Sequence, residues 1–465
     1  MGKKKTRRSG VFMNEAGLEP TTSASGGRRS IQMSYSSGNR AFRPTPGHFS
    51  RDQRFCTGGW CNFMALVQTC RVNPIRSLAD PRLTSLLVDL LSEEHLPPLD
   101  RWFSTRARAQ RWSVADQKLL WDSLRRALTR AYGLLAAAST PEATSWGGFR
   151  VALRGRAQEW AVRANLATEA SSRPEAAGIP GWLSGALGDR ALRSGWTDAD
   201  RSRFLAFQEV AAPVQVRFRP GNDGEACRQR LTASGEAVPS EIAGILQLTG
   251  HRGLEAGEDW KNGLVEIQDA ASQLSLGRLG LRPGMRVWDV CAGQGGKTLL
   301  AASELRGKGA LVATDVAEAK LKILKDRVRR SGWQNIRILP WDGMSPPDFG
   351  PEVNTRGGFD RVIVDAPCSA IGTWRRDPEG RFRLTPRAMK ELAKHQHRLI
   401  RLGWEALKTG GKLAYVTCSW LPSEDEEVVE AFVAETGARV EHQELLGLPA
   451  FDANTLFVCI LEKLR

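Results

Sequence analysis

Two cysteines in the C-terminal half of the chain have neighbours that suit thiol chemistry. Cys368 lies in the segment Asp-Ala-Pro-Cys-Ser and Cys418 in Thr-Cys-Ser, and each follows an apolar run typical of a buried strand. Most free cysteines are small, buried and unreactive, so either one alone would predict little. Two at neighbouring strand ends, each followed by serine and with Asp365 close by, favour a nucleophilic thiolate, which nearby helix N-termini and basic residues would stabilise.

A glycine-rich segment, DVCAGQGGK, is the second candidate site. It runs from Asp289 to Lys297, where an expected strand ends and a helix begins. Glycines here let the backbone turn tightly and approach a ligand, and the helix start offers free N–H groups. The segment is not a phosphate-binding P-loop, because Cys291 occupies the position of the first glycine of that motif. It predicts either a cofactor loop or only a tight turn.

Four aspartates follow four successive expected strands. Asp289 and Asp315 close the first two strands, and Asp342 and Asp365 follow the third and fourth. A single aspartate at a strand end is ordinary, since it often caps a helix or turn. Four at one edge of a parallel sheet predict a ligand crevice, in which the acid after the second strand, Asp315, typically binds a ribose hydroxyl pair.

The scaffold that must position these residues is visible from Met285 onward. The apolar runs MRVWDV, ALVATD, NIRILPWD, FDRVIVDAP and KLAYVTCS are typical of buried strands. Helical runs begin near Gly296, Glu318 and Pro386, and a last one lies in SEDEEVVEAFV. This alternation predicts an α/β domain with a doubly wound, mostly parallel sheet over residues 281–465, with its ligand site at the carboxyl ends of the strands.

An all-helical domain is expected before the sheet domain, over residues 64–180. From about residue 76 to 138, Leu, Trp, Ala and Val recur at helical spacing. Ser113 and Asp116 predict the N-terminal cap of one of these helices. Residues 139–180 are interrupted by Pro, Ser and Gly and predict a connector.

A small mixed α/β subdomain is expected over residues 181–280. The segment GWLSGAL is typical of a helix, whereas VQVRFRP alternates with a period of two. This alternation predicts an exposed strand on which Arg217 and Arg219 share one face.

The composition is that of an ordinary globular protein. Hydrophobic residues make up 41% and charged residues 25% of 465 residues, which excludes collagen, a coiled coil and a wholly disordered chain. No apolar run approaches the roughly 18 residues of a transmembrane helix, and no secretory signal follows the basic N-terminus. Eight cysteines without a Cys-x-x-Cys pair predict free thiols, no metal site and a cytoplasmic location.

The net charge of +15 points to a polyanionic partner. Residues 1–63 hold 11 Lys and Arg against 3 Asp and Glu, which is +8 of this excess. We expect these residues to be a disordered basic extension, or to precede a true start at Met64. The rest of the chain is still basic, so nucleic acid is the first hypothesis. A membrane surface is the second, but no basic amphipathic helix with an aromatic face supports it.

Three segments together resemble the signatures of the Nop/Sun family of RNA cytosine-5 methyltransferases, of the bacterial RsmB type. They are DVCAGQGGKT, DAPCSAIGTWRRDPEGRF and LAYVTCSWLPSEDEEVV. The likeness runs from about Gly181 to the end of the chain, and the N-terminal helices resemble, more loosely, the NusB-like domain of RsmB-type enzymes. It implies a Rossmann-like domain that transfers a methyl group from S-adenosylmethionine to carbon 5 of a cytosine. The implied partner is small-subunit ribosomal RNA, and the implied protein is a cytoplasmic monomer without membrane or metal.

The resemblance also implies roles for individual residues. Cys418 would be the nucleophile, Asp365 would hydrogen-bond the cytosine ring, and Cys368 would act when the covalent bond to RNA is broken. The expected cofactor contacts are Cys291, Ala292, Gly293, Gln294, Gly295, Gly296, Lys297, Asp315, Asp342 and Asp365. Within this set the 291–297 loop would hold the methionine part, Asp315 the ribose and Asp342 the adenine edge. The expected RNA contacts are Arg375, Arg376, Arg217 and Arg219.

The chain departs from the family pattern at three places. Gln294 stands where proline is usual, which predicts a looser cofactor loop, Asp425 stands where asparagine is usual, and DANTLFV replaces the terminal Asp-Gly-Phe-Phe pattern. Two alternatives therefore stay open. One is the same chemistry on transfer RNA or large-subunit RNA. The other is an RNA-binding or ribosome-assembly protein with a decayed cofactor site. A DNA cytosine methyltransferase is disfavoured, since in that class the nucleophile resembles the cysteine of the Pro-Cys-Ser motif.

Overall fold

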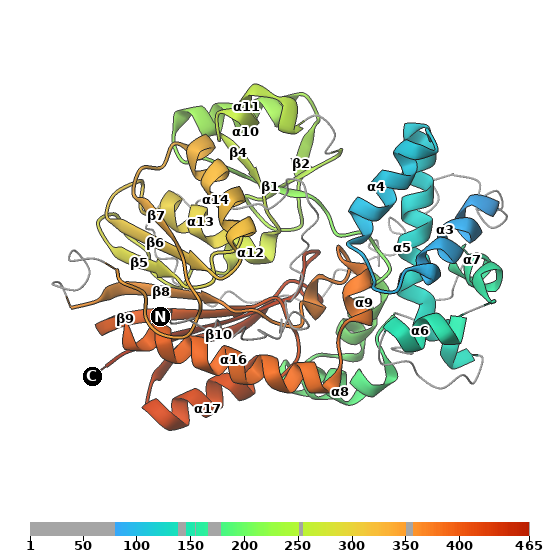
Figure 1. Ribbon diagram of the computed structural model, residues 1–465. Helices are drawn as coiled ribbons and strands as arrows, with labels where there is room; N and C mark the ends of the chain where they lie inside the picture. Colours follow the sequence, from blue (N-terminus) through green and yellow to red (C-terminus); the bar gives the residue numbers. More distant parts are fainter. Residues whose placement is uncertain are drawn as a thin grey trace, which may run out of the picture.

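Seven apolar strands build the central sheet of the C-terminal half, in the order β10-β11-β9-β8-β5-β6-β7 (Figure 1). The computed structural model describes residues 80–137, 146–153, 155–165, 178–250, 254–349 and 357–464. The strands are β5 (Arg286–Asp289), β6 (Ala310–Asp315), β7 (Ile336–Pro340), β8 (Phe359–Asp365), β9 (Leu407–Thr417), β10 (Arg439–Leu446) and β11 (Leu456–Glu462). Strands β5 to β9 are parallel, and β11 pairs antiparallel with β9 and β10. The expected doubly wound, mostly parallel sheet is confirmed.

Helices cover both faces of this sheet. On one face lie α16 (Pro386–Glu405) and α17 (Glu426–Thr436), and on the other α12 (Ala270–Leu274), α13 (Gly296–Glu304) and α14 (Glu318–Ser331). Because side chains alternate along a strand, Val362 and Val364 pack in the cluster with α16 and α17, whereas Ile363 packs with α12 and α13. The strands read as continuous apolar runs because both faces are buried.

A second, smaller sheet forms above the first in Figure 1. It has the order β2-β3-β1-β4, and all its pairs are antiparallel. Its elements are β1 (Gln215–Phe218), β2 (Ala237–Pro239), β3 (Leu246–Leu248), β4 (Val265–Ile267), α10 (Asn222–Ala233), the 3₁₀ turn η2 (Leu254–Ala256) and α11 (Glu258–Lys261). The expected strand in VQVRFRP is therefore present, as the interior strand β1.

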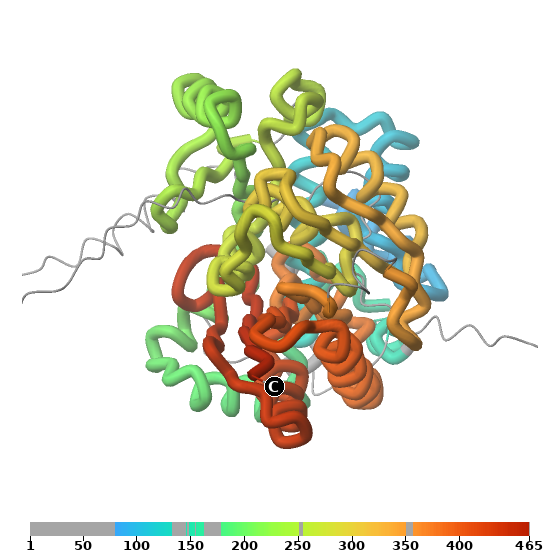
Figure 2. The backbone as a smooth tube through the Cα atoms, turned by 90° about the vertical axis from the view of Figure 1, so that its left-hand side faces the viewer, coloured from blue at the N-terminus to red at the C-terminus, as the bar shows by residue number. Residues whose placement is uncertain are grey.

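The rest of the segment 181–280 packs elsewhere. The 3₁₀ turn η1 (Gly181–Leu183) and the helices α8 (Ser184–Arg193) and α9 (Asp198–Phe207) lie at the opposite side of the sheet domain from β1–β4 (Figures 1 and 2). They share a core with Trp374 and Trp420, which lie in the loops after β8 and β9. The residues expected as one subdomain thus form two separate parts.

The N-terminal domain is helical, as expected from the spacing of its apolar residues. Its helices are α3 (Pro81–Ser92), α4 (Leu99–Ala109), α5 (Val114–Ala137), α6 (Trp146–Leu153) and α7 (Ala157–Asn165). The backbone N–H of Asp116 donates to Ser113 Oγ over 3.1 Å, so the predicted cap of α5 is confirmed. Within the predicted connector at 139–180, the described residues 146–153 and 155–165 are instead largely helical, because α6 and α7 insert Phe149 and Trp160 into the helical core. Residues 1–79, which include the predicted basic extension, lie outside the described residues.

The helical domain is joined to the sheet domain by the 3₁₀ turn η4 (Pro378–Phe382), which lies between β8 and α16. The ring of Phe382 packs edge-on against Phe149, with ring centroids 4.5 Å apart, and belongs to the helical core. Tyr132 Oη donates to the carbonyl of Arg381, and the N–H of Leu99 donates to Glu379 Oε1, each over 3.1 Å. The segment that follows Cys368 is therefore anchored in the helical domain.

Candidate active site

The two thiols meet at the carboxyl edge of the sheet. Strands β8 and β9 are parallel neighbours, and Asp365 is in register with Val416. This register carries Cys368 and Cys418 out of the sheet side by side, with their Sγ atoms 3.1 Å apart. Both cysteines are free; Cys368 is buried and Cys418 is half-buried. The sequence expectation that they lie together agrees with this geometry.

The environment of the two thiols differs. The hydrogen bond with Cys418 and burial together raise the pKa of Cys368 well above its ordinary value. Cys368 therefore holds its proton at neutral pH. The more exposed sulfur of Cys418 is the one a substrate can reach.

Asp365 lies at the end of β8, three residues before Cys368, and forms an ion pair. Its Oδ1 is 2.7 Å from the Nζ atom of Lys297, near the start of α13. The lysine side chain is only 6% exposed, whereas the Asp365 side chain is 36% exposed. The ion pair fixes the orientation of a carboxylate that remains open to a ligand.

The glycine-rich turn is fixed by contacts that require glycine. Gly293 has a φ of +54°, and its N–H donates to Asp315 Oδ2 over 2.8 Å. Gly295 caps α13 at a φ of +89°, and a Cβ atom there would lie 2.2 Å from Leu324 Cδ1. These positive φ values and this close approach place the turn directly against β6 and α14.

Asp315 and Asp342 lie further along the same edge. The Oδ1 atom of Asp315 accepts a hydrogen bond from the N–H of Ala317 over 2.8 Å, so its carboxylate is held from both sides. Asp342 is exposed and accepts from the N–H of Met344. A glycine turn at a helix N-terminus beside an oriented carboxylate fits the methionine and ribose parts of a nucleoside cofactor.

Asp289 and Cys291 do not present charge to this crevice. Asp289 is fully buried, Thr298 Oγ1 donates to its Oδ2 over 2.6 Å, and burial raises its pKa to about 7. Burial and the neighbouring aspartates raise the pKa of Cys291 well above its ordinary value. Of the four acids predicted at the sheet edge, Asp342 is exposed, Asp365 is half-buried, Asp315 is buried with both oxygens hydrogen-bonded, and Asp289 anchors α13.

Gln294 does not leave the turn unsupported. Its carbonyl accepts a hydrogen bond from Arg327 Nη1 over 2.9 Å, and Arg327 also donates through Nη2 to Glu266 of β4 over 2.9 Å. The predicted loss of rigidity without proline is therefore opposed by an arginine from α14. Sequence reasoning missed Arg327, because its only signal was a basic helix that resembles a solvated one.

Arg375 and Arg376, predicted to contact RNA, both form hydrogen bonds within the protein. Arg375 is 1% exposed and donates to the carbonyls of Val210 and Ala453 over 3.0 and 3.2 Å. Arg376 donates to the carbonyl of Pro213 over 2.7 Å and to Asp269 over 3.0 Å. Both guanidinium groups hold backbone loops, which the charge pattern alone could not reveal.

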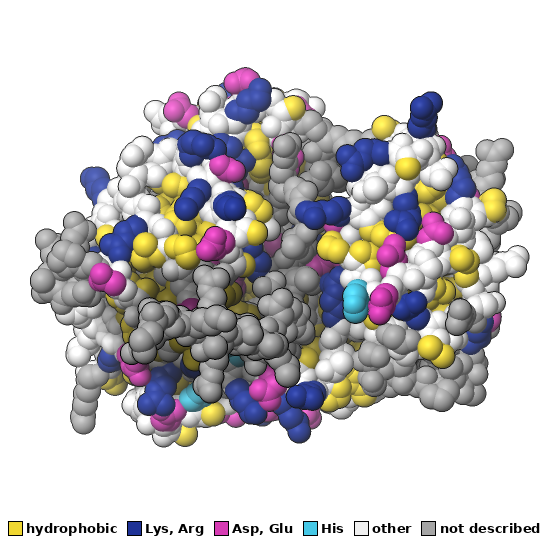
Figure 3. Space-filling model, in the orientation of Figure 1, with side chains coloured by type: hydrophobic (Ala, Val, Ile, Leu, Met, Phe, Trp, Pro, Cys, Tyr) yellow, Lys and Arg dark blue, Asp and Glu magenta, His cyan; other side chains and the backbone are white. Residues whose placement is uncertain are grey.

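The predicted exposed face of β1 is wrong at Arg217. Arg217 is 4% exposed and lies opposite Glu266 of β4, and burial lowers its pKa to about 9. Arg219 is half-buried, with its guanidinium 4.8 Å from the ring centre of Trp333. Other Lys and Arg side chains are spread over both domains on the face shown in Figure 3.

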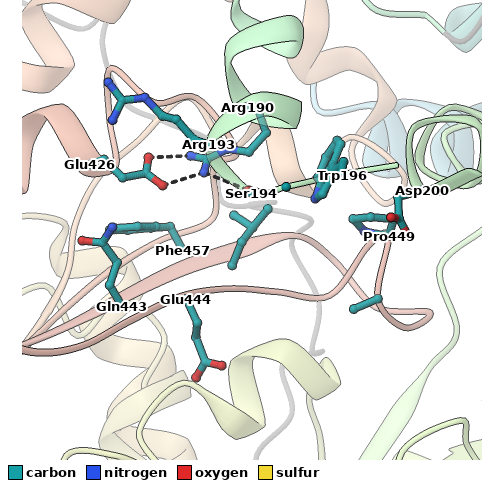
Figure 4. Close-up of a pocket in the computed structure, with 13 residues that line it drawn as sticks. Arg190, Arg193, Ser194, Trp196, Asp200, Glu426, Gln443, Glu444, Pro449 and Phe457 are labelled. Carbon is teal, nitrogen blue, oxygen red and sulfur yellow. Dashed lines mark hydrogen bonds and ion pairs between the residues drawn. The ribbon is translucent and has the colours of Figure 1, made fainter. Parts of the chain in front are cut away.

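Asp425 belongs to a buried ionic cluster behind the Thr-Cys-Ser motif. Its Oδ1 accepts from Thr417 Oγ1 over 2.6 Å, and its Oδ2 accepts from Arg190 Nη2 over 2.9 Å. Arg190, from α8, also donates to both carboxylate oxygens of Glu426 (Figure 4). Burial raises the pKa of Asp425 well above its ordinary value, and Arg190 opposes this rise, so the aspartate at the position of the usual asparagine has an arginine as its partner. A cavity of about 390 Å³ lies beside Arg190, away from the thiols.

Sequence reasoning also missed Glu424, which lies just behind the two cysteine motifs. It is fully buried and accepts hydrogen bonds from Ser369, Ser419 and Gln396. Its only signal was its place in the acidic run SEDEE, which resembles the solvated start of a helix.

Within the described residues, no group of three or more His, Cys, Asp or Glu side chains is arranged to hold a metal ion. In the same part of the chain, no helix has the length and apolar character needed to cross a membrane.

Known proteins resemble the part of the chain that contains this site. Residues 278–455 match the family described as 16S rRNA methyltransferase RsmB/F. Ribosomal RNA small subunit methyltransferase B of Enterobacter sp. (strain 638) is 36% identical over 177 residues, which cover 38% of this chain and 40% of that protein. The corresponding protein of Klebsiella pneumoniae (strain 342) is 37% identical over 175 residues, which cover 37% of this chain and 39% of that protein. The chain thus spans about 40% of the length of these relatives.

A solved structure extends the likeness in fold. The crystal structure of PH0851 matches with a TM-score of 0.59 at 20% identity, and covers 84% of this chain and 98% of that chain. At this identity the match shows a shared fold. The likeness to RsmB/F-type rRNA methyltransferases therefore covers the sheet domain, over residues 278–455, and supports S-adenosylmethionine as the cofactor of this domain.

Proposed function

We propose that this protein methylates carbon 5 of a cytosine in small-subunit ribosomal RNA. The observation that carries the chemistry is the pair of thiols 3.1 Å apart, beside the carboxylate of Asp365 at the same sheet edge. The ribosomal substrate is supported by the description of the matching family and by the names of the relatives.

Carbon 5 of cytosine is too electron-poor to accept a methyl group directly. In the proposed reaction the thiolate of Cys418 adds to carbon 6, which forms a sulfur–carbon bond and makes carbon 5 enamine-like. Asp365, held by Lys297, accepts a hydrogen bond from the exocyclic amino group, and contact with ring nitrogen 3 requires a proton between these two acceptors, which the ring takes up as the thiolate adds. S-adenosylmethionine, when bound, supplies an electrophilic methyl group.

Release of the product requires the loss of the carbon 5 proton. The electrons of that C–H bond then restore the ring double bond as the bond between carbon 6 and Cys418 breaks. Cys368 lies next to this sulfur, and because its raised pKa keeps the thiol protonated, it must first release its own proton to solvent before its thiolate can accept the proton from carbon 5. We assign Cys368 to the removal of this proton.

The RNA must present an unstacked base, because a cytosine inside a helix cannot reach the sheet edge. We propose that the positive charge of the chain attracts the RNA backbone and that the helical domain, residues 80–165, contributes to this contact. The same chemistry on transfer RNA or large-subunit RNA is the alternative.

The test uses purified protein, total RNA and methyl-labelled S-adenosylmethionine, and compares the wild type with Cys418→Ala and Cys368→Ala. We expect label in 5-methylcytosine of small-subunit RNA, no label with Cys418→Ala, and a trapped RNA–protein adduct with Cys368→Ala. Label in another RNA would support the alternative substrate. No label with any RNA and no binding of the cofactor would support a decayed RNA-binding protein instead.

A further inference from the structure

A buried carboxylate lies behind the two cysteine-bearing segments. Glu424, in the loop after β9, is 0% exposed. One of its oxygens, Oε1, accepts from the backbone N–H of Ser369 over 2.8 Å, and the other, Oε2, accepts from Ser419 Oγ over 2.8 Å and from Ser369 Oγ. Ser369 and Ser419 are the residues that directly follow the two cysteines, so one side chain contacts both motifs.

The two motifs also meet directly, through the pair of sulfur atoms and through the hydroxyls of Ser369 and Ser419, whose Oγ atoms are 3.4 Å apart. Strand pairing between β8 and β9 ends with the hydrogen bond from the N–H of Ala366 to the carbonyl of Val416. Beyond it, the N–H of Gly372 donates to the carbonyl of Cys418 over 3.0 Å. The segments that carry the sulfur atoms lie between these two backbone contacts, which is where Glu424 joins them.

Glu424 is itself held from two other elements. Gln396 of α16 donates through Nε2 both to Glu424 Oε1 over 3.0 Å and to the carbonyl of Pro367 over 2.9 Å. Tyr415 of β9 donates through its hydroxyl to the backbone carbonyl of Glu424. A carboxylate fixed in this way sets the place of the serines that contact it.

The direction of these hydrogen bonds matches a carboxylate. Ser419 Oγ accepts from the N–H of Leu421 over 3.0 Å, so its own proton is free to be donated to Glu424. The N–H of Ser369 and the amide of Gln396 can only donate. Oε1 must therefore accept, whereas the serine hydroxyls that face Oε2 would have to reverse their hydrogen bonds to accept from the N–H groups of an amide at this position.

We propose that Glu424 is a positioning residue that sets the separation and orientation of Cys368 and Cys418 through Ser369 and Ser419. The proposal rests on the proposed function only for its effect on methyl transfer, since the geometry of the thiols can be measured without activity. Glu424 does not touch the substrate. It acts on the reaction through the two serines.

The first test measures the thiol geometry directly on the full chain. Dibromobimane becomes fluorescent when its two alkyl bromides have reacted with two neighbouring thiols, and peptide mapping identifies the bridged pair. We expect a Cys368–Cys418 bridge in the wild type and a fall of about tenfold in its rate of formation in Glu424→Ala, the scale expected when a buried charged hydrogen-bond acceptor is lost. Glu424→Gln should recover part of this rate.

Two controls separate positioning from unfolding. Cys227 and Cys459 are buried elsewhere and report any general opening of the fold by becoming reactive. The variant Asp360→Asn removes a carboxylate from the opposite end of β8 and should leave the bridge intact. If Glu424→Ala exposes Cys227 and Cys459, the milder variants Ser369→Ala and Ser419→Ala replace it, and each should slow bridging while Cys227 and Cys459 stay protected.

The second test measures methyl transfer. Because a small displacement of a reacting group lowers rates steeply, we expect kcat to fall on the order of 100-fold in Glu424→Ala while the KM for RNA changes little. Bridging at the wild-type rate in all of these variants would overturn the proposal, as would an unchanged kcat in a folded Glu424→Ala. A wild type that bridges but never methylates RNA would contradict the proposed function and leave the positioning role standing.

Discussion

Asp289 is a fully buried carboxyl group whose ionisation opposes folding. Its pKa in the folded protein is about 7, against an ordinary value of 3.8, because burial disfavours the charge more than the Thr298 hydrogen bond favours it. Between these two pH values the folded state holds a proton that the unfolded state has lost. The group therefore lowers stability as pH rises, by about 1.4 kcal/mol per pH unit.

This linkage predicts the behaviour of Asp289→Asn. The wild type should lose more unfolding free energy than the variant between about pH 5 and about pH 6.5, as measured by urea unfolding. Asp360→Asn is the control. Although burial opposes it, ion pairing with Lys408 and a hydrogen bond from Arg286 lower the pKa of Asp360, so its ionisation changes stability only at pH values below those of this experiment. Parallel pH profiles of wild type and Asp289→Asn would show that Asp289 is ionised in the folded state.

The second prediction for a single side chain concerns Arg327 and the binding of the cofactor. Arg327→Ala removes the hydrogen bond to the Gln294 carbonyl and should weaken S-adenosylmethionine binding about tenfold, as titration calorimetry would measure. Arg329→Ala is the matched control, since Arg329 lies on the same helix but is exposed and pairs with Asp326. Equal affinities in the two variants would show that the arginine does not support the turn.

At this scale the sequence predicted which residues meet but not what the basic ones contact. Cys368, Cys418 and Asp365 were predictable because strand ends in a parallel sheet share an edge, and the spacing of the motifs gives those ends. The environment of Arg375 was not, because a loop arginine buried against carbonyls has the same sequence pattern as one in water. Burial is set by segments far away along the chain.

The element that positions the cofactor site is the turn between β5 and α13. Gly295→Ala would need a positive φ, which costs about 1–2 kcal/mol, and its Cβ would overlap Leu324, which costs about 1–3 kcal/mol more. Gly410 has a similar φ of +73°, but nothing lies within 4 Å of its Cβ position. Gly410→Ala therefore isolates the cost of the backbone conformation.

We expect Gly295→Ala to lose more unfolding free energy than Gly410→Ala in urea titrations, and to lose cofactor binding as well. Equal losses in the two variants would mean that Leu324 moves aside without cost. Retained cofactor affinity in Gly295→Ala would mean that the turn tolerates displacement.

The elements of the sheet domain were predictable because their periodicity is strong and their strands are buried on both faces. The helices α6 and α7 were not predicted, because the Pro, Ser and Gly residues of the segment 139–180 suggested a loop. Its aromatic residues Trp146, Phe149 and Trp160 belong to the helical core, which only the packing of α5 and η4 reveals. The local sequence favours a connector in this segment, but the burial of these aromatic side chains against the other helices stabilises α6 and α7.

At the scale of the whole molecule, we expect the replacement of Arg375 to lower the stability of the protein and to leave its affinity for RNA unchanged. Arg375→Ala leaves Asp452 without its buried partner and removes hydrogen bonds to two loops, which should cost about 3–5 kcal/mol. Thermal unfolding measures this cost. At a temperature where the variant is folded, the salt dependence of RNA binding should keep the wild-type slope, since no phosphate contact is lost.

If RNA binding by folded Arg375→Ala depended less steeply on salt than binding by the wild type, Arg375 would have to contact an RNA phosphate. Arg219→Ala is the comparison, because this half-buried arginine, stacked on Trp333, holds a less enclosed charge. The wild type itself should show a steep dependence on salt, as expected of a chain with a net charge of +15.

The anchoring of Phe382 in the helical core has a consequence for how this protein can change over generations. Recombination that exchanged the helical domain for an unrelated one would leave Phe382 without the ring of Phe149 and would release the segment that leads back to Cys368. A productive exchange would have to replace both surfaces in one event. The two domains are therefore constrained to be inherited together, and substitutions in α5 and α6 are expected to be accompanied by substitutions in η4.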